Sequence, residues 1–128
     1  MTEFKIIRLG HQGDGIADGP LFAPMTLPGE IVTAMQEGDA LKNVRIQTPS
    51  SDRVAAPCRH FKSCGGCQLQ HASDEFVATW KAEIVKRAFS AHDLSPEIRS
   101  TLTSPAKSRQ RATVAAKRTK SGAMVGFH

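Results

Sequence analysis

The fold expected for this chain is decided by residues 3–48, which read EFKIIRLGHQGDGIADGPLFAPMTLPGEIVTAMQEGDALKNVRIQT. Short apolar stretches at residues 4–9, 21–23 and 31–34 are separated by turns rich in glycine and proline, and residues 44–48 alternate apolar and polar side chains. This alternation is typical of a half-buried strand. Roughly four or five short strands in such a length favour a small barrel, so we predict an OB-like β-barrel.

Three glycines, at positions 10, 13 and 15, lie between the first two expected strands. Their spacing is not that of a dinucleotide-binding or phosphate-binding loop, and no helix pattern follows them. We therefore interpret all three as residues of a plain turn.

The composition is that of an ordinary folded protein, with 128 residues, 40% hydrophobic side chains and ten glycines. Its apolar runs are far shorter than the roughly 20 residues that a membrane helix needs. Residues 1–5 do not begin an apolar segment of the kind found in secretory signals. We therefore expect a cytoplasmic monomer without a membrane partner.

Basic side chains concentrate at the C-terminal end. Residues 1–98 carry ten Lys and Arg against twelve Asp and Glu, whereas residues 99–128 carry seven Lys and Arg and no acidic side chain. The asymmetry predicts a polyanionic partner for this end, although a solvated basic tail explains the charge alone equally well.

Residues 53–72 contain too few apolar side chains to order themselves, because fixing the backbone of each residue costs about 1–2 kcal/mol. The segment carries all three cysteines, Cys58, Cys64 and Cys67, in a C-x5-C-x2-C pattern. In a reducing compartment, clustered thiols are more often metal-binding or catalytic than disulfide-bonded. We therefore predict that bound metal orders this segment.

Three thiolates are one short of the four ligands that a structural zinc ion or an iron–sulfur cluster normally takes. His60 or His71 could complete a zinc site, which would make the chain a zinc-binding RNA module. A thioredoxin-like redox pair at Cys64 and Cys67 is disfavoured because no βαβ pattern surrounds it. An iron–sulfur electron carrier is a further alternative, and the basic C-terminal end counts against it.

A long helix is expected after the cysteines. Ser73 resembles an N-cap, and the apolar residues between Phe76 and Phe89 recur on one continuous face. The helix should end near His92, since Pro96 prevents it from continuing. We interpret the apolar face as part of a core.

The Cys58-x5-Cys64-Gly65-Gly66-Cys67-x2-Gln70-His71 string, which runs directly into this helix, resembles the cluster motif of the RNA (uracil-5-)-methyltransferases. The likeness is greatest to the bacterial enzymes that methylate uridine in 23S ribosomal RNA. It extends to the N-terminal barrel, which is similar to a TRAM domain. Residues 108–112 and 126–128 match the start of the family's central β-rich domain.

The resemblance implies a mainly β chain with one long helix, divided into three parts. Residues 1–52 form a TRAM-like OB-type barrel, residues 53–95 the iron–sulfur segment and the helix, and residues 96–128 the truncated start of the central and methyltransferase region.

The resemblance also implies a 4Fe-4S cluster held by Cys58, Cys64, Cys67 and a fourth cysteine outside this chain. It places the S-adenosyl-L-methionine pocket, the nucleophile and the base in a missing C-terminal domain. We therefore expect the RNA-binding and iron–sulfur part of an rRNA uridine C5-methyltransferase, which is not catalytic alone. Transfer RNA is the alternative substrate. The cluster is expected to have a structural role.

Residues 109–118 and 123–127 are predicted to form two strands joined by a hairpin turn. Two arginines lie two residues apart on the first strand, so their side chains should share one face. The candidate phosphate-binding residues are Arg109, Arg111, Lys117 and Lys120. Candidates for stacking on or contacting RNA are Phe4, Phe22, Phe61 and Lys62, with core packing preferred for the phenylalanines.

Overall fold

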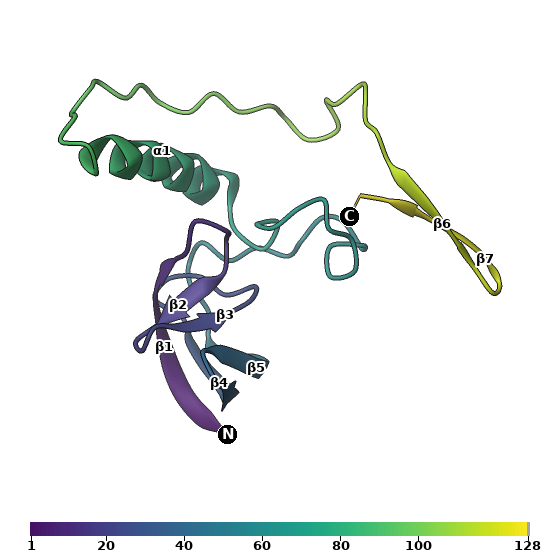
Figure 1. Cartoon of the computed structure of the whole chain (residues 1–128), viewed down its shortest axis with the longest axis horizontal. Helices are drawn as coiled ribbons and strands as arrows, with labels where there is room; N and C mark the ends of the chain where they lie inside the picture. The colour runs from purple at the N-terminus through teal and green to yellow at the C-terminus, as the bar shows by residue number, and fades with distance from the viewer. Residues whose placement is uncertain (128) are drawn as a thin grey trace.

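The structure, a computed structural model, describes residues 1–127 (Figure 1). Within them the chain is mainly β, with a closed five-stranded barrel, one helix and a two-stranded hairpin. The elements are β1 (Thr2–Leu9), β2 (Gly15–Ala17), β3 (Leu21–Ala23), β4 (Ile31–Glu37), β5 (Ala40–Thr48), α1 (Asp74–Ser90), β6 (Ala115–Thr119) and β7 (Gly122–Gly126). The predicted mainly β fold with a small barrel and one long helix is confirmed.

The barrel strands follow the order β1-β2-β3-β5-β4, and β4 pairs back with β1. All neighbouring strands are antiparallel except β3 and β5, which meet in parallel where Phe22 pairs with Ala40. Closure removes the exposed strand edges on which another chain could pair.

The barrel interior is the hydrophobic core of the described chain. Its buried members are Ile6, Ala17, Leu21, Ala23, Val32, Ala34 and Leu41. Neighbouring side chains on a strand point to opposite faces, so Ile6 is fully buried whereas Ile7 is 53% exposed. Burying each large aliphatic side chain contributes about 1.5–3 kcal/mol, which stabilises strands as short as β2 and β3.

The glycine-rich stretch after β1 is a turn only in part. The Gly10 N–H donates to the Asp14 carbonyl oxygen over 2.8 Å, and the Gly13 N–H donates to that of Gly10 over 2.9 Å. Gly15 instead begins β2, is buried and pairs with Leu9 and Ala23. The interpretation of Gly15 as a turn residue is therefore wrong.

Helix α1 begins as predicted, because the Ser73 hydroxyl accepts a hydrogen bond from the Phe76 N–H over 3.2 Å. None of its residues is buried, however, and no strand within residues 1–127 packs against it. The interpretation of its apolar face as core is wrong, since that face has no sheet or second helix to cover it here. Alongside it runs the coil that follows, where the Thr101 hydroxyl donates to the Ala78 carbonyl oxygen over 2.7 Å (Figure 1). No helix in the described part of the chain is long and apolar enough to cross a membrane.

The hairpin of β6 and β7 stands apart from the barrel (Figure 1). Its ladder runs from Ala115 opposite Gly126 to Thr119 opposite Gly122. The expected strand over residues 109–118 is wrong at its beginning, because residues 109–114 are irregular. A β-strand needs a neighbouring strand to supply its ladder hydrogen bonds. The residues of β7 pair only with residues 115–119, so residues 109–114 have no strand partner within the described chain.

Candidate nucleic-acid interface

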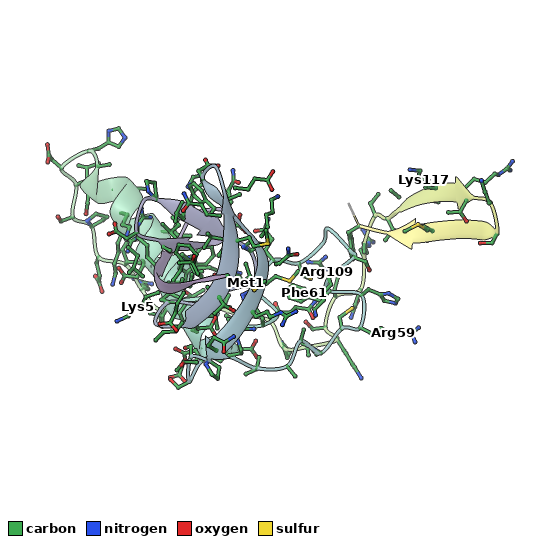
Figure 2. All side chains as sticks on the ribbon, turned by 90° about the horizontal axis from the view of Figure 1, so that it is seen from below. Met1, Lys5, Arg59, Phe61, Arg109 and Lys117 are labelled. Carbon is green, nitrogen blue, oxygen red and sulfur yellow. The ribbon has the colours of Figure 1, made fainter. Side chains whose placement is uncertain are left out.

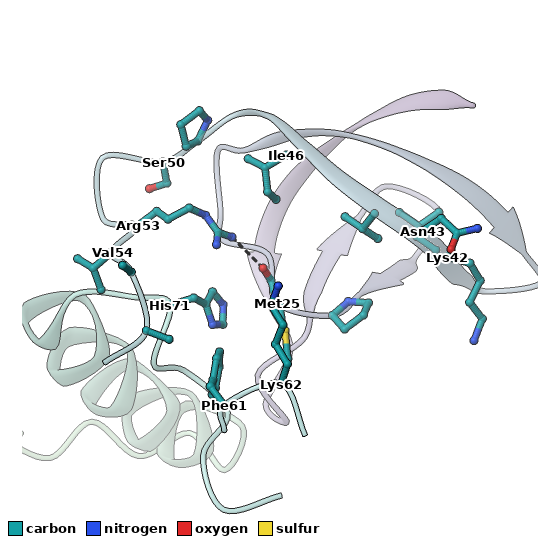
Figure 3. Close-up of a pocket in the computed structure, with 16 residues that line it drawn as sticks. Met25, Lys42, Asn43, Ile46, Ser50, Arg53, Val54, Phe61, Lys62 and His71 are labelled. Atoms are coloured by element: carbon teal, nitrogen blue, oxygen red, sulfur yellow. Dashed lines mark hydrogen bonds between the residues drawn. The ribbon is translucent and has the colours of Figure 1, made fainter. Parts of the chain in front are cut away.

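A buried carboxylate fastens the cysteine segment to the barrel. The Glu30 side chain, fully buried just before β4, accepts hydrogen bonds from the backbone N–H groups of Leu27 (2.6 Å) and Ser50 (3.0 Å). It also accepts from Arg53, from Nε over 2.6 Å and from Nη2 over 2.8 Å. Nη2 donates in addition to the Met25 carbonyl oxygen over 2.8 Å (Figure 3). No local sequence pattern marks this pair, because its two residues lie 23 positions apart.

Where the cysteine segment meets the barrel, the pKa values of Glu30 and His71 are both lowered. Burial alone would raise the pKa of Glu30, but hydrogen bonds from Arg53, Ser50 and Leu27, together with the Arg53 charge, outweigh it and lower the pKa. Burial lowers the pKa of His71 and the Arg53 charge lowers it further, and together they outweigh the Thr26 backbone and the Glu30 charge, which raise it. At neutral pH Glu30 is therefore charged and His71 is neutral.

Acidification is expected to lower the free energy of unfolding in two stages. Because the pKa of His71 is lowered in the folded chain, its contribution declines once the pH falls below the ordinary value of 6.5. The Glu30 contribution is complete above the ordinary pKa of 4.5 and is lost as the pH falls through the lower folded-state value. Urea unfolding at a series of pH values measures this, and Glu30→Gln should remove the second stage. A constant free energy of unfolding from about pH 7 to about pH 3 would contradict the expectation.

The two ends of the segment 53–72 pair with each other, so it forms a closed loop. Arg53 and Ala72 make an isolated antiparallel bridge. The Val54 N–H donates to the His71 carbonyl oxygen over 3.0 Å, and the Ser73 N–H donates to the Asp52 carbonyl oxygen over 2.8 Å. We call residues 53–72 the cysteine loop. Its base is held by these bonds and by the Glu30–Arg53 pair.

All three cysteines of the cysteine loop are free thiols, with Cys58 and Cys67 exposed and Cys64 partly exposed. Cys64 and Cys67 line the same cavity of about 490 Å³. The Gly66 N–H donates to Sγ of Cys64 over 3.4 Å. Within residues 1–127 no three His, Cys, Asp or Glu side chains come together as a metal-binding group. The ligand assignment for the three cysteines therefore stays a prediction.

The two histidines considered as zinc ligands lie in different surroundings. His60 is exposed. His71 is buried and stacks on Phe61, with ring centroids 5.7 Å apart. It lines a different cavity from the one that Cys64 and Cys67 share.

The end of β7 docks on the tip of the cysteine loop. The Gly65 N–H donates to the Phe127 carbonyl oxygen over 3.3 Å, and Sγ of Cys64 lies 3.6 Å from that oxygen. A Cβ atom added to Gly66 would lie 2.7 Å from Cδ2 of Phe127, so only glycine allows this approach. Segments about sixty residues apart in sequence thus meet through a backbone hydrogen bond and through the Phe127 ring packed over Gly66.

Two of the four predicted phosphate-binding residues lie at this contact. Arg109 and Arg111 line, together with Phe127, one cavity of about 700 Å³. Both are exposed, although the shared strand face predicted for them does not exist. Lys117 lies on β6, out along the hairpin, whereas Arg109 lies beside the cysteine loop (Figure 2). Lys120 is exposed at the hairpin turn.

Comparison with curated proteins shows what the whole chain resembles. It is 44% identical over 133 aligned positions to an uncharacterized RNA methyltransferase of Caulobacter vibrioides, covering 99% of this chain and 32% of that protein. This chain is a relative of the RNA methyltransferases. A counterpart from Mesorhizobium japonicum is 41% identical over 99% of this chain and 31% of its own length. No protein-family model matches the chain.

One RNA methyltransferase relative carries a more specific name. The chain is 34% identical over 140 aligned positions to the 23S rRNA (uracil(1939)-C(5))-methyltransferase RlmD of Francisella tularensis subsp. novicida, covering 98% of this chain and 31% of that protein. The alignment takes in the barrel, the cysteine loop, the helix and the hairpin alike, and the resemblance drawn from the cysteine motif is confirmed. The chain spans about a third of the length of the curated relatives that it matches.

Proposed function

We propose that this chain is the RNA-binding part of an S-adenosyl-L-methionine-dependent enzyme that methylates C5 of uridine in 23S ribosomal RNA. The observation that carries the proposal is the similarity to RlmD over 98% of this chain. The placement of two exposed arginines in a cavity beside the cysteine loop supports it. A base in folded RNA must leave its stack before its ring can react, at a cost of a few kcal/mol. Phosphate contacts made by this part of the enzyme can supply binding energy for that step.

We propose the same three domains for the chain as the resemblance implies. Residues 1–52 serve as the TRAM-like barrel, residues 53–95 as the cluster segment and helix, and residues 96–128 as the start of the central region. The closed barrel and the hydrogen-bonded base of the cysteine loop support the first boundary.

We also propose that the cysteine loop holds a 4Fe-4S cluster. Three of its ligands would be Cys58, Cys64 and Cys67, and the fourth would be a thiolate from outside this chain. The donor chemistry fits, because such clusters are held by cysteine thiolates and tuned by hydrogen bonds to sulfur. The three thiols are free, and a backbone N–H already points at one of them. When bound, the cluster would fix the tip of the loop on which Phe127 docks.

Anaerobic reconstitution with iron, sulfide and a small thiol, which stands in for the fourth thiolate, is expected to give a brown protein that retains iron and acid-labile sulfide after desalting. Changing Cys58, Cys64 or Cys67 to Ser should lower the retained iron severalfold, since a thiolate ligand is lost. Ser63→Ala, which removes a neighbouring exposed hydroxyl, serves as the control and should retain iron normally. A colourless protein with stoichiometric zinc would contradict the cluster and favour a zinc-binding module.

The double variant Arg109→Ala/Arg111→Ala is expected to weaken binding to single-stranded RNA and to reduce its salt dependence. Each neutralised phosphate contributes about −0.7 to the slope of log K against log salt, so the slope should flatten by roughly 1–1.5. Fluorescence anisotropy with labelled RNA at several salt concentrations measures both quantities. Arg suits this role because its planar fork donates two parallel hydrogen bonds to phosphate.

The matched control removes two exposed cations elsewhere, Lys81→Ala/Arg87→Ala on α1. Its salt slope should equal that of the unaltered chain. An unchanged slope in the arginine variant, with circular dichroism showing an intact fold, would remove Arg109 and Arg111 from the RNA surface.

A further inference from the structure

A cavity lies between the barrel and the cysteine loop, apart from the arginine cavity (Figure 3). Its volume is about 890 Å³, within the range of roughly 300–1,000 Å³ typical of small-molecule sites. Strand β5 contributes Val44 and Ile46, and the cysteine loop contributes Phe61 and His71. The cavity thus has apolar and aromatic walls from two parts of the chain.

His71 is an unsatisfied polar group in the wall of this cavity. The residue is 4% exposed, and within residues 1–127 neither Nδ1 nor Nε2 has a hydrogen-bond partner of good geometry, although the Thr26 backbone lies close enough to raise the pKa of the ring. Its ring is held against Phe61 at an interplanar angle of 30°. A buried imidazole without partners is costly, and in its neutral form it offers one donor and one acceptor. The two ring nitrogens point away from each other, so a ligand in the cavity would complete one of them with a single donor or acceptor.

Free positive charge lies at the exposed border of the cavity. Arg53 also lines it, but its guanidinium is committed to Glu30 and to the Met25 carbonyl oxygen. Lys42 and Lys62 are exposed, and within residues 1–127 neither forms a salt bridge. These two ammonium groups are therefore available to an anionic ligand.

We propose that this cavity binds one unpaired nucleotide of RNA, with its base against the apolar wall and the Phe61–His71 pair and its phosphate at Lys42 and Lys62. The inference rests on the proposed function, which supplies RNA as the partner. A base edge offers a donor or an acceptor to one nitrogen of the neutral His71 ring, and its flat apolar faces suit the walls. Unstacked bases of single-stranded RNA are bound in this way, on aromatic side chains beside positive charge.

The test compares two labelled oligomers of equal length, a single-stranded RNA and an oligomer of abasic spacers with the same phosphates. His71→Phe keeps an aromatic ring and removes both ring nitrogens. It should weaken binding of the base-containing RNA about tenfold and leave binding of the abasic oligomer unchanged. Arg109→Ala/Arg111→Ala should weaken both oligomers by the same factor. Equal effects of His71→Phe on the two oligomers, or no effect on either, would overturn the proposal.

A second measurement uses the unaltered chain, so that folding of the variant does not matter. Nuclear magnetic resonance of the histidine ring nitrogens should show a shift at His71 when the RNA is added and none with the abasic oligomer, while the exposed His60 serves as an internal reference. Uridine monophosphate alone should shift the His71 signals only at a much higher concentration than the RNA. If the free nucleotide bound as tightly as the RNA, the proposal that the bound nucleotide belongs to an RNA strand would be overturned. Absence of any RNA binding would overturn the proposed function as well. Binding that is independent of bases would overturn only the assignment of this cavity.

Discussion

Replacing Glu30 with Ala is expected to lower the free energy of unfolding by about 3–5 kcal/mol, which is a large part of the stability of a small domain. The carboxylate is fully buried and accepts four hydrogen bonds, two from backbone N–H groups and two from Arg53. Its removal leaves the Arg53 charge without a partner at a site where the side chain is only 24% exposed. Chemical unfolding followed by circular dichroism measures the loss.

The control for Glu30 is Glu83→Ala, which breaks an exposed ion pair with Lys86 at 3.4 Å on α1. Exposed pairs of this kind contribute about 0.2–1 kcal/mol, because water screens them. If the two variants destabilised the chain equally, Glu30 would not be the anchor of the cysteine loop. Hydrogen exchange should also quicken in the cysteine loop of the Glu30 variant, since its base would lose the bonds that hold it to the barrel.

Gly15→Ala is expected to destabilise the barrel by about 2–4 kcal/mol. A Cβ atom at this position would lie 1.8 Å from Oγ1 of Thr26 and 2.9 Å from Cγ2 of Ile6, and both of these residues are fully buried. The Thr26 hydroxyl would have to move, and it would lose its hydrogen bond to the Ala23 carbonyl oxygen, which is now 2.9 Å long. The thermal midpoint and the unfolding free energy measure the effect.

Gly126→Ala is the matched control, because Gly126 also lies in a strand but a Cβ atom there would have no neighbour within 4 Å. Its stability should stay within about 0.5 kcal/mol of the unaltered chain. A similar loss in both variants would mean that the strand conformation of glycine, and not the contact with Thr26, makes the substitution costly.

The sequence alone determined those features that depend on neighbouring residues. Alternating side chains and the turn residues between them indicated the barrel strands, and Ser73 was recognisable as the cap of α1 because its bond is to Phe76, three residues on. The cysteine spacing was sufficient to recognise the relation to the RNA methyltransferases, which the similarity over nearly the whole chain confirms. Charge counting identified the basic C-terminal end, of which Arg109 and Arg111 line one cavity.

Only the tertiary structure decided which distant residues meet. Glu30 and Arg53 are 23 residues apart, and Gly66 and Phe127 are farther apart still, so neither pair leaves a local pattern. The absence of a local pattern also explains why the predictions for Gly15 and for the apolar face of α1 were wrong. Gly15 became a strand residue because β1 and β3 pair on either side of it, and Thr26 packs against it. The apolar face of α1 is at most partly buried, because no strand reaches it within the described chain. A side chain's periodicity predicts the face on which it lies, but the atoms opposite that face are set by how the rest of the chain folds around it.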